Sequence, residues 1–251
     1  MLGGEAMMEQ LPIPDRLIKI LSFTPHRTYA DVFGGVPGVL VLMNKEPSPV
    51  EVINDLDGWI SDFFLTIADK SKRREMQNEV ERLRSDTPPS PIDLHGPASR
   101  SAWLYLALLR GGKPVEVRNF RTRWLEEAVR GHLASLEGLY EIHQRIQRVQ
   151  LDNRHVLSFL RTYDTEQTLF LLVPPGDFGF GSPLPAAVRN RLIALLPSIR
   201  GSWVMFCRES DDLHPLEKVA KKTSLPSGLA LYVRLVGYPR TMTFWEMMDN
   251  P

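Results

Sequence analysis

The stretch that decides the fold runs from Tyr29 to Asp57 and reads YADVFGGVPGVLVLMNKEPSPVEVINDLD. A short β-prone run ends in the pair Gly34-Gly35, and the apolar helical segment Val39–Met43 follows it. Val50–Ile53 is a second β-branched run with turn residues behind it. This order is typical of a βαβ unit, in which a glycine turn lets the backbone approach a ligand and an acid after the second strand can bind ribose. An ordinary βαβ turn without a ligand fits the same residues.

Similar patterns continue on both sides of a charged middle region and predict an α/β fold with a doubly wound sheet. Thr168–Val173 is an uninterrupted apolar run, as expected of a central parallel strand that is covered on both faces. Lys70–Arg84 is almost entirely charged or polar, and a proline-rich segment follows. We therefore expect a core formed by residues 1–69 and 149–251, with a helical insert at residues 70–148.

Composition narrows the class of protein. The 251 residues are 43% hydrophobic, enough for one large core, and the formal net charge is zero, so no overall field favours nucleic acid or membrane. The single cysteine, Cys207, lies in an apolar run and indicates a buried thiol in a reducing, cytoplasmic setting. We expect no membrane span and no signal peptide. The histidines show no metal-ligand spacing, so we expect no metal.

One local stretch is strongly basic. Between residues 100 and 123, six basic side chains accompany a single acid, Glu116. Such a cluster is either a solvated face or a surface that contacts DNA phosphates. The candidate DNA-binding residues are Arg100, Arg110, Lys113, Arg118, Arg121 and Arg123.

Several stretches, taken in order, resemble the Dam-like class of DNA adenine-specific methyltransferases. The matching segments are Thr28–Leu40, Val52–Phe64, Val149–Leu160, Tyr163–Pro175 and Phe244–Asn250. The resemblance implies a Rossmann-like fold that uses S-adenosylmethionine, with DNA as the partner. It also implies that residues 70–148 form the target-recognition region.

The resemblance assigns a cofactor site that has lost some of its usual residues. It implies that Asp31 holds the methionine amino group, that Phe33, Gly34 and Gly35 form the turn, and that Asp55 binds the ribose. Strand-end capping is the alternative role for each acid. The acid that holds the adenine amine in the family is replaced by His155, and the opening Gly-Gly-Lys motif is absent near residues 11–15. These losses weaken the expectation that S-adenosylmethionine still binds.

The catalytic loop departs further from the family. Its motif reads Asp-Pro-Pro-Tyr, whereas this chain has Val173, Pro174, Pro175 and Gly176. The acid accepts a hydrogen bond from the target amine, worth ~1.5–3 kcal/mol. The aromatic ring stacks on the flipped base, worth ~1–3 kcal/mol. Losing both predicts transfer slower by several powers of ten. Asp177 is a candidate substitute, four residues beyond the usual position of the acid.

These departures favour a folded methyltransferase-like protein whose methyl transfer is weak or lost and which keeps a role in binding DNA or a protein partner. Two alternatives stay open. The first is an active adenine methyltransferase with a variant catalytic loop. The second is a scaffold subunit that does not bind DNA. A homo-oligomer is compatible with each of them.

Overall fold

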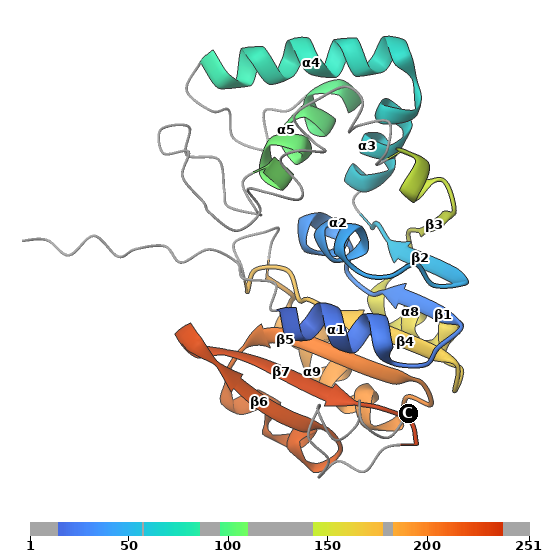
Figure 1. Ribbon diagram of the computed structural model, residues 1–251. Coiled ribbons are helices and arrows are strands. Elements are labelled where there is room, and N and C mark those ends of the chain that lie inside the picture. The colour runs from blue at the N-terminus through green and yellow to red at the C-terminus, as the bar shows by residue number, and fades with distance from the viewer. Residues whose placement is uncertain (1–14, 57, 86–95, 110–142, 178–182, 238–251) are drawn as a thin grey trace, which may run out of the picture.

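The computed structural model describes residues 15–56, 58–85, 96–109, 143–177 and 183–237 (Figure 1). Its centre is a seven-stranded sheet in the order β3-β2-β1-β4-β5-β7-β6. The first five of these strands run parallel to one another, while β7 is antiparallel to both β5 and β6. The strands are β1 (Thr28–Asp31), β2 (Val50–Asn54), β3 (Val149–Asp152), β4 (Thr168–Leu172), β5 (Ser202–Arg208), β6 (Lys221–Leu225) and β7 (Leu229–Arg234).

Strand order reverses between β1 and β4. From β1 the chain proceeds outward through β2 and β3, and it then returns to place β4 on the other side of β1. The register sets Asp31, at the end of β1, opposite Ile53 and Leu171 on its two neighbours. In open parallel sheets, ligands bind outside the carboxyl ends of strands at such a reversal. This edge is therefore where a site is expected.

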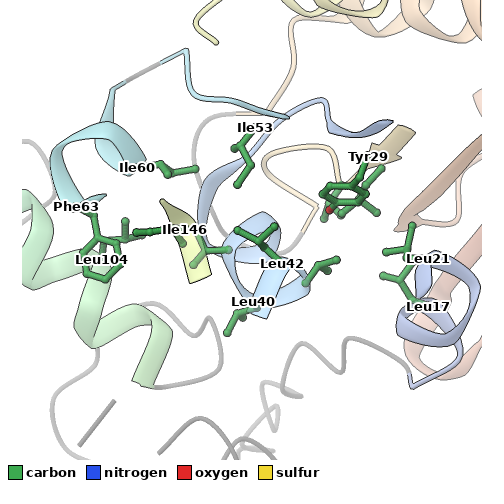
Figure 2. Packing of buried hydrophobic residues seen from close by; sticks show 14 of the residues in the cluster. Leu17, Leu21, Tyr29, Leu40, Leu42, Ile53, Ile60, Phe63, Leu104 and Ile146 are labelled. Atoms are coloured by element: carbon green, nitrogen blue, oxygen red, sulfur yellow. The ribbon is translucent and has the colours of Figure 1, made fainter. Parts of the chain in front are cut away.

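Helices cover both faces of the sheet, so the predicted α/β doubly wound arrangement is confirmed. One face packs against α1 (Asp15–Phe23), α2 (Gly35–Asn44) and the helical region beyond them (Figure 2). The other face packs against α8 (Val156–Tyr163), α9 (Ala186–Leu195) and two short 3-10 segments, η2 (Leu196–Ser198) and η3 (Asp211–Lys218). Along β4, Leu169 and Leu171 face the first layer, and Phe170 and Leu172 face the second. The strand is buried on both faces, as its apolar run predicted.

Beyond the sheet lie α3 (Trp59–Ala68), which precedes the expected insert, and two helices of the insert itself, α4 (Lys70–Ser85) and α5 (Pro97–Leu109). They pack against one another, and their buried residues belong to the same apolar cluster as Tyr29 and Ile53 of the sheet. Trp59 and Trp103 meet edge to face at 5.1 Å between ring centroids. The charged run after residue 70 is thus a helix, which buries only Met76 and Val80 among its described side chains.

A buried ionic cluster links Arg145, near the end of the insert region, to strand β2 of the sheet. Glu51, in β2, is 3% exposed and accepts hydrogen bonds from Lys45 Nζ at 2.5 Å and Arg145 Nη2 at 2.9 Å. Arg145 also donates to the carbonyl of Leu42 at 3.0 Å, at the end of α2. Because each charge has a partner, the cluster stays buried without an orphaned ion.

The observed bounds differ from the sequence expectations in a few places. Helix α2 begins at Gly35, the second glycine of the turn, whereas the sequence suggested a start near Val39. Strand β6 and segment η3 were not predicted. The helix expected at 124–147 and the terminal aromatic segment lie largely or wholly outside the described residues. Among the described helices, none has both the length and the apolarity that crossing a membrane requires.

Candidate functional site

The carboxyl ends of β1, β2 and β4 bring the candidate residues to one edge of the sheet. Asp31 ends β1, Asp55 follows β2, and Val173 follows β4. The parallel pairings of β1 with β2 and with β4 place these ends side by side. Three of the sequence segments singled out above therefore meet where the strand order reverses.

Asp31 is the most unusual side chain at this edge. It is 1% exposed, and its Oδ1 accepts hydrogen bonds from the backbone N–H groups of Phe33 at 3.2 Å and Gly34 at 2.9 Å. Its Oδ2 is buried with no partner among the described residues. Burial raises the pKa of Asp31 to about 6, against the opposing effect of the two amides. A buried acceptor left without a donor is costly, and such groups concentrate at functional sites.

Glycines make room for this carboxylate. A Cβ on Gly38 would lie 1.8 Å from Asp31 Oδ2, and a Cβ on Gly34 would lie 2.5 Å from the carbonyl oxygen of Asn54. Gly34 also has φ +58°, where L side chains are strained. Gly35 has φ +68° but meets only Pro37, at 3.7 Å, so the turn leaves space there. Sequence reasoning missed Gly38, although it lies four residues after Gly34, one helical turn onward.

Asp55 caps the start of helix α3. It is 6% exposed, its Oδ1 accepts from the N–H of Ile60 at 3.2 Å, and its Oδ2 accepts from the N–H and the hydroxyl of Ser61, both at 2.7 Å. These contacts satisfy orphan amides at the start of α3. A ribose would have to share oxygens that already serve the helix.

Asn54 is a residue of this edge that sequence reasoning treated only as part of a turn. Its Nδ2 donates to the carbonyls of Val32 at 3.0 Å and Arg154 at 2.9 Å, and its Oδ1 accepts from the N–H of Arg154 at 3.0 Å. It is 3% exposed. The Asn54 side chain thus links the segment after β1 to the segment after β3 and holds these two strand ends together.

His155 lies at the start of α8 and is exposed. Its Nδ1 accepts a hydrogen bond from the N–H of Leu157 at 3.4 Å, which makes it the N-cap of that helix. The half-buried Phe33 packs against the apolar cluster on the α8 and α9 face. Neither residue offers the buried acceptor that an adenine amine requires.

The described residues directly after β4 are closely packed. Val173 and Pro174 are buried, and Pro175 is half-buried. Gly176 has φ +89°, and a Cβ there would lie 2.7 Å from Cα of Pro183. The position where the family has an aromatic ring therefore has no room for a side chain.

Asp177 is held by two arginines beyond this turn. Its Oδ2 accepts from the N–H of Arg208 at 3.1 Å, its carbonyl accepts from Arg208 Nε at 2.8 Å, and its Oδ1 lies 3.7 Å from Nη1 of Arg189. Burial raises the pKa of Asp177, while the Arg208 amide and the charges of both arginines oppose that rise. The carboxylate is thus directed toward β5 and α9.

The expected DNA-binding surface is described at one position only. Arg100, in α5, pairs through Nη2 with Asp62 Oδ2 of α3 at 2.7 Å, and its Nε is buried without a partner among the described residues. Its charge is thus engaged between two helices. Arg110, Lys113, Arg118, Arg121 and Arg123 lie outside the described residues. Where the structure is described, no three His, Cys, Asp or Glu side chains gather so as to hold a metal ion.

Fold and site together define an α/β protein with a mostly parallel sheet, compatible with a Rossmann-like fold, and with a carboxylate oxygen at the reversal of strand order that has no partner among the described residues. No protein-family model matches the chain, and neither does any curated protein.

S-adenosylmethionine fits this edge in part. Asp31 Oδ2, which has no partner among the described residues, is an acceptor suited to an ammonium group, but the side chain is 1% exposed and this oxygen lies against the backbone at Gly38. Asp55 and His155 are both engaged in capping helices, so the ribose and adenine contacts have no equally free acceptor among these candidate residues. Among these candidate residues, the buried carboxylate of Asp31 thus suits the amino-acid end of the molecule, and no equally free acceptor suits the rest.

Proposed function

We propose that this chain is a DNA adenine methyltransferase-like protein that keeps the donor-binding framework, has weak or lost methyl-transfer activity, and serves to bind DNA or a partner protein. One observation carries the proposal. At the same edge of the sheet, Asp31 keeps a carboxylate oxygen without a partner in the described chain, whereas the described part of the loop after β4 has neither an unengaged carboxylate nor space for an aromatic ring at Gly176.

The strand order supports the proposed family. A parallel sheet whose last strand enters antiparallel between the fifth and sixth is the arrangement expected of the Rossmann-like methyltransferase fold that the sequence resemblance implies. Here β7 has that position, between β5 and β6. Fold alone does not establish activity, so the functional argument depends on the residues at the edge.

Where the methyl donor would bind, the chain supplies the charge of Asp31 and the tight glycine turn. The ionised Asp31 would bind an ammonium group through a charge-assisted hydrogen bond, and the Phe33 and Gly34 amides hold its other oxygen in place. Since Asp31 is buried, a ligand reaches it only when the residues around it move. That movement, and the engaged Asp55, predict weak binding. The cofactor, when bound, supplies an electrophilic methyl group.

On the acceptor side, the chain lacks the groups that methyl transfer to adenine uses. Val173 has no polar side-chain atom, and Gly176 abuts Pro183. Asp177, the candidate substitute, is engaged by Arg208 and Arg189. A base extruded into this loop would have neither the acceptor nor the ring that hold it in the family.

Calorimetry with S-adenosylmethionine and a transfer assay with radiolabelled donor on mixed-sequence DNA test the proposal together. We expect weak donor binding that Asp31→Asn abolishes, while the exposed control Asp211→Asn leaves it unchanged. We expect transfer to be lower by ~10²–10⁴-fold than an intact loop provides. Robust transfer that disappears with Asp177→Ala would establish the active alternative, and no donor binding at millimolar concentration would contradict the retained framework.

A further inference from the structure

A serine, a histidine and a lysine meet at the edge of the sheet opposite the candidate site. His26 lies two residues before β1, and Ser48 lies two residues before β2. Since Thr28 and Val50, the first residues of these parallel strands, are paired in the sheet, the segments ahead of them converge. The length of β1, roughly 10 Å, separates this cluster from Asp31. The cluster is therefore a group of its own.

The contacts of His26 make it a neutral base directed at the serine. Its Nδ1 lies 2.5 Å from the carbonyl oxygen of Thr24, and because a carbonyl only accepts, Nδ1 carries the proton. Nε2 is then the acceptor, and it lies 2.7 Å from Ser48 Oγ. Burial lowers the pKa of His26; the charge of Lys45 adds to this effect, while the Thr24 carbonyl and the charge of Glu51 oppose it. The imidazole is thus neutral near pH 7 and can take the serine proton.

Lys45 contacts the same hydroxyl. Its Nζ donates to Ser48 Oγ at 2.9 Å, and also to Glu51 Oε1 at 2.5 Å and to the carbonyl of Glu46 at 2.7 Å. The Lys45 side chain is 0% exposed. A buried ammonium group in contact with a hydroxyl stabilises negative charge that develops there when the proton leaves.

The loop that carries Ser48 holds it firmly and keeps it within reach of solvent. Ser48 is half-buried, and Pro47 and Pro49 on either side of it are exposed. The two proline rings restrict the backbone, and the N–H of Ser48 donates to Glu51 Oε1 at 3.1 Å. Because His26 and Lys45 already lie against the hydroxyl, the remaining approach suits a small group.

A serine that only joins two loops needs a single partner. The hydroxyl of Ser48 has two, a neutral base as its acceptor and a buried cation as its donor. These are the two contacts that activate a serine nucleophile, and the Thr24 carbonyl is the third group that orients the base.

We propose that Ser48 is the nucleophile of an acyl-transfer site for small carboxylic esters, with His26 as general base and Lys45 as the group that stabilises the oxyanion. Ser48 Oγ bonds to the carbonyl carbon while its proton passes to His26 Nε2. The ester C–O bond then breaks, and the leaving oxygen takes that proton and departs as an alcohol. Water, deprotonated by Nε2, releases the carboxylic acid and restores the serine. This activity does not depend on the proposed methyl donor.

A fluorophosphonate probe tests the nucleophile in the whole chain, since an activated serine oxygen bonds to its phosphorus as fluoride leaves. Peptide mass spectrometry should find the probe on Ser48 and at least ~100-fold less on Ser198, an exposed serine whose hydroxyl donates to the carbonyl of Leu195 at 2.8 Å. His26→Gln keeps an acceptor but no base and should slow labelling by ~100-fold, whereas Ser198→Ala should leave it unchanged. No labelling at Ser48, or an unchanged rate in His26→Gln, would overturn the proposal.

Turnover is measured with p-nitrophenyl acetate. The rate of nitrophenol release should rise with pH as His26 loses its proton and level off below neutral pH, and Ser48→Ala should abolish the release that remains after the uncatalysed rate is subtracted. The same pH profile and rate in Ser48→Ala would count against the site.

A cysteine substitution gives a second test, which also applies if Ser48→Ala does not fold in thermal melting. In Ser48→Cys, the contacts with His26 and Lys45 should lower the pKa of the new thiol and speed its alkylation by iodoacetamide at about pH 6.5. The native Cys207 is 1% exposed, and burial raises its pKa to about 12, so it should not react. Adding His26→Gln should slow the alkylation by at least ~10-fold. Equal alkylation with and without His26 would overturn the proposal.

Discussion

At the scale of single residues, the carboxyl group of Asp31 is held in place by hydrogen bonds and at the same time lowers the stability of the fold because it is buried. The same carboxyl group is fixed by two amides through one oxygen and left without a donor among the described residues at the other. A protein selected only for stability would have an amide or an apolar side chain there, because those groups avoid the cost of a buried charge.

Replacing Asp31 by asparagine should stabilise the protein above about pH 6. The folded pKa is about 6 and the ordinary value is 3.8, so the unfolded chain ionises first as the pH rises. Native stability therefore falls between about pH 4 and 6 by up to ~3 kcal/mol and is flat above that range. The amide side chain of the Asp31→Asn variant does not ionise, so the variant escapes this loss.

Urea denaturation at several pH values between about 4 and 8 measures this effect. The stability difference between Asp31→Asn and native protein should grow with pH and then level off, while Asp211→Asn should show no such trend. A variant that is equally destabilised at every pH would mean that the carboxylate has a donor in solution.

At the scale of elements, the described residues after β4 combine the loss of the Asp-Pro-Pro-Tyr motif with a backbone that leaves no room for a side chain at Gly176. Gly176 has a backbone conformation that disfavours side chains, and the chain returns at Pro183 to fill the adjacent space. Restoring the family motif by Val173→Asp and Gly176→Tyr should therefore not restore methyl transfer in the radiolabelled-donor assay. Transfer that returns in this double variant would show that the loop can still open around a base.

Alanine substitution separates the two penalties at Gly176. Gly96 has the same φ, +89°, but nothing lies within 4 Å of a Cβ there. Both Gly96→Ala and Gly176→Ala incur the cost of a left-handed residue, ~1–2 kcal/mol. Only Gly176→Ala adds a clash with Pro183, so it should lower the melting temperature clearly more. Equal shifts in the two melts would show that the loop has room to adapt.

The elements differ in how far sequence predicts them. β4 was predictable because every residue from Thr168 to Leu172 is buried and apolar or hydrogen-bonded. Helix α4 was expected only as part of a helical insert and its bounds were not predicted, because among its described side chains it buries only Met76 and Val80 and so lacks a continuous apolar stripe. β6 was missed for a similar reason, since the polar residues of Lys221–Leu225 are half-buried or exposed at the sheet edge.

Site residues follow the same logic. Asp31 was named because the family resemblance assigns a role to the acid ahead of the glycine turn, and both lie in one stretch of chain. Asn54 was not, because its partner Arg154 is 100 residues away and only the folded chain brings them together. The capping role of Asp55 was one of two interpretations, and the position of Ser61 decided which one the structure adopts.

At the scale of the whole molecule, the cluster around Glu51 holds the two sides of the insert region together. Glu51→Gln should cost ~3–5 kcal/mol, because Lys45 and Arg145 would be left without this counter-charge. Chemical denaturation measures the loss, with the exposed Glu81→Gln as the control. A loss no larger than in the control would mean that water or another acid replaces the carboxylate.

The pairing of β1 with β4 has a consequence for how the chain assembles. Asp31 aligns with Leu171, so the contact joins positions 140 residues apart in sequence. Closing a loop is entropically unfavourable, yet the cost grows only logarithmically, by ~0.6 kcal/mol for each doubling of loop length. Insertions or deletions in the intervening segment should therefore change the free energy of folding only slightly. A contact between positions so distant in sequence does, however, slow folding. The candidate site at this edge therefore forms only after β1 and β4 have paired.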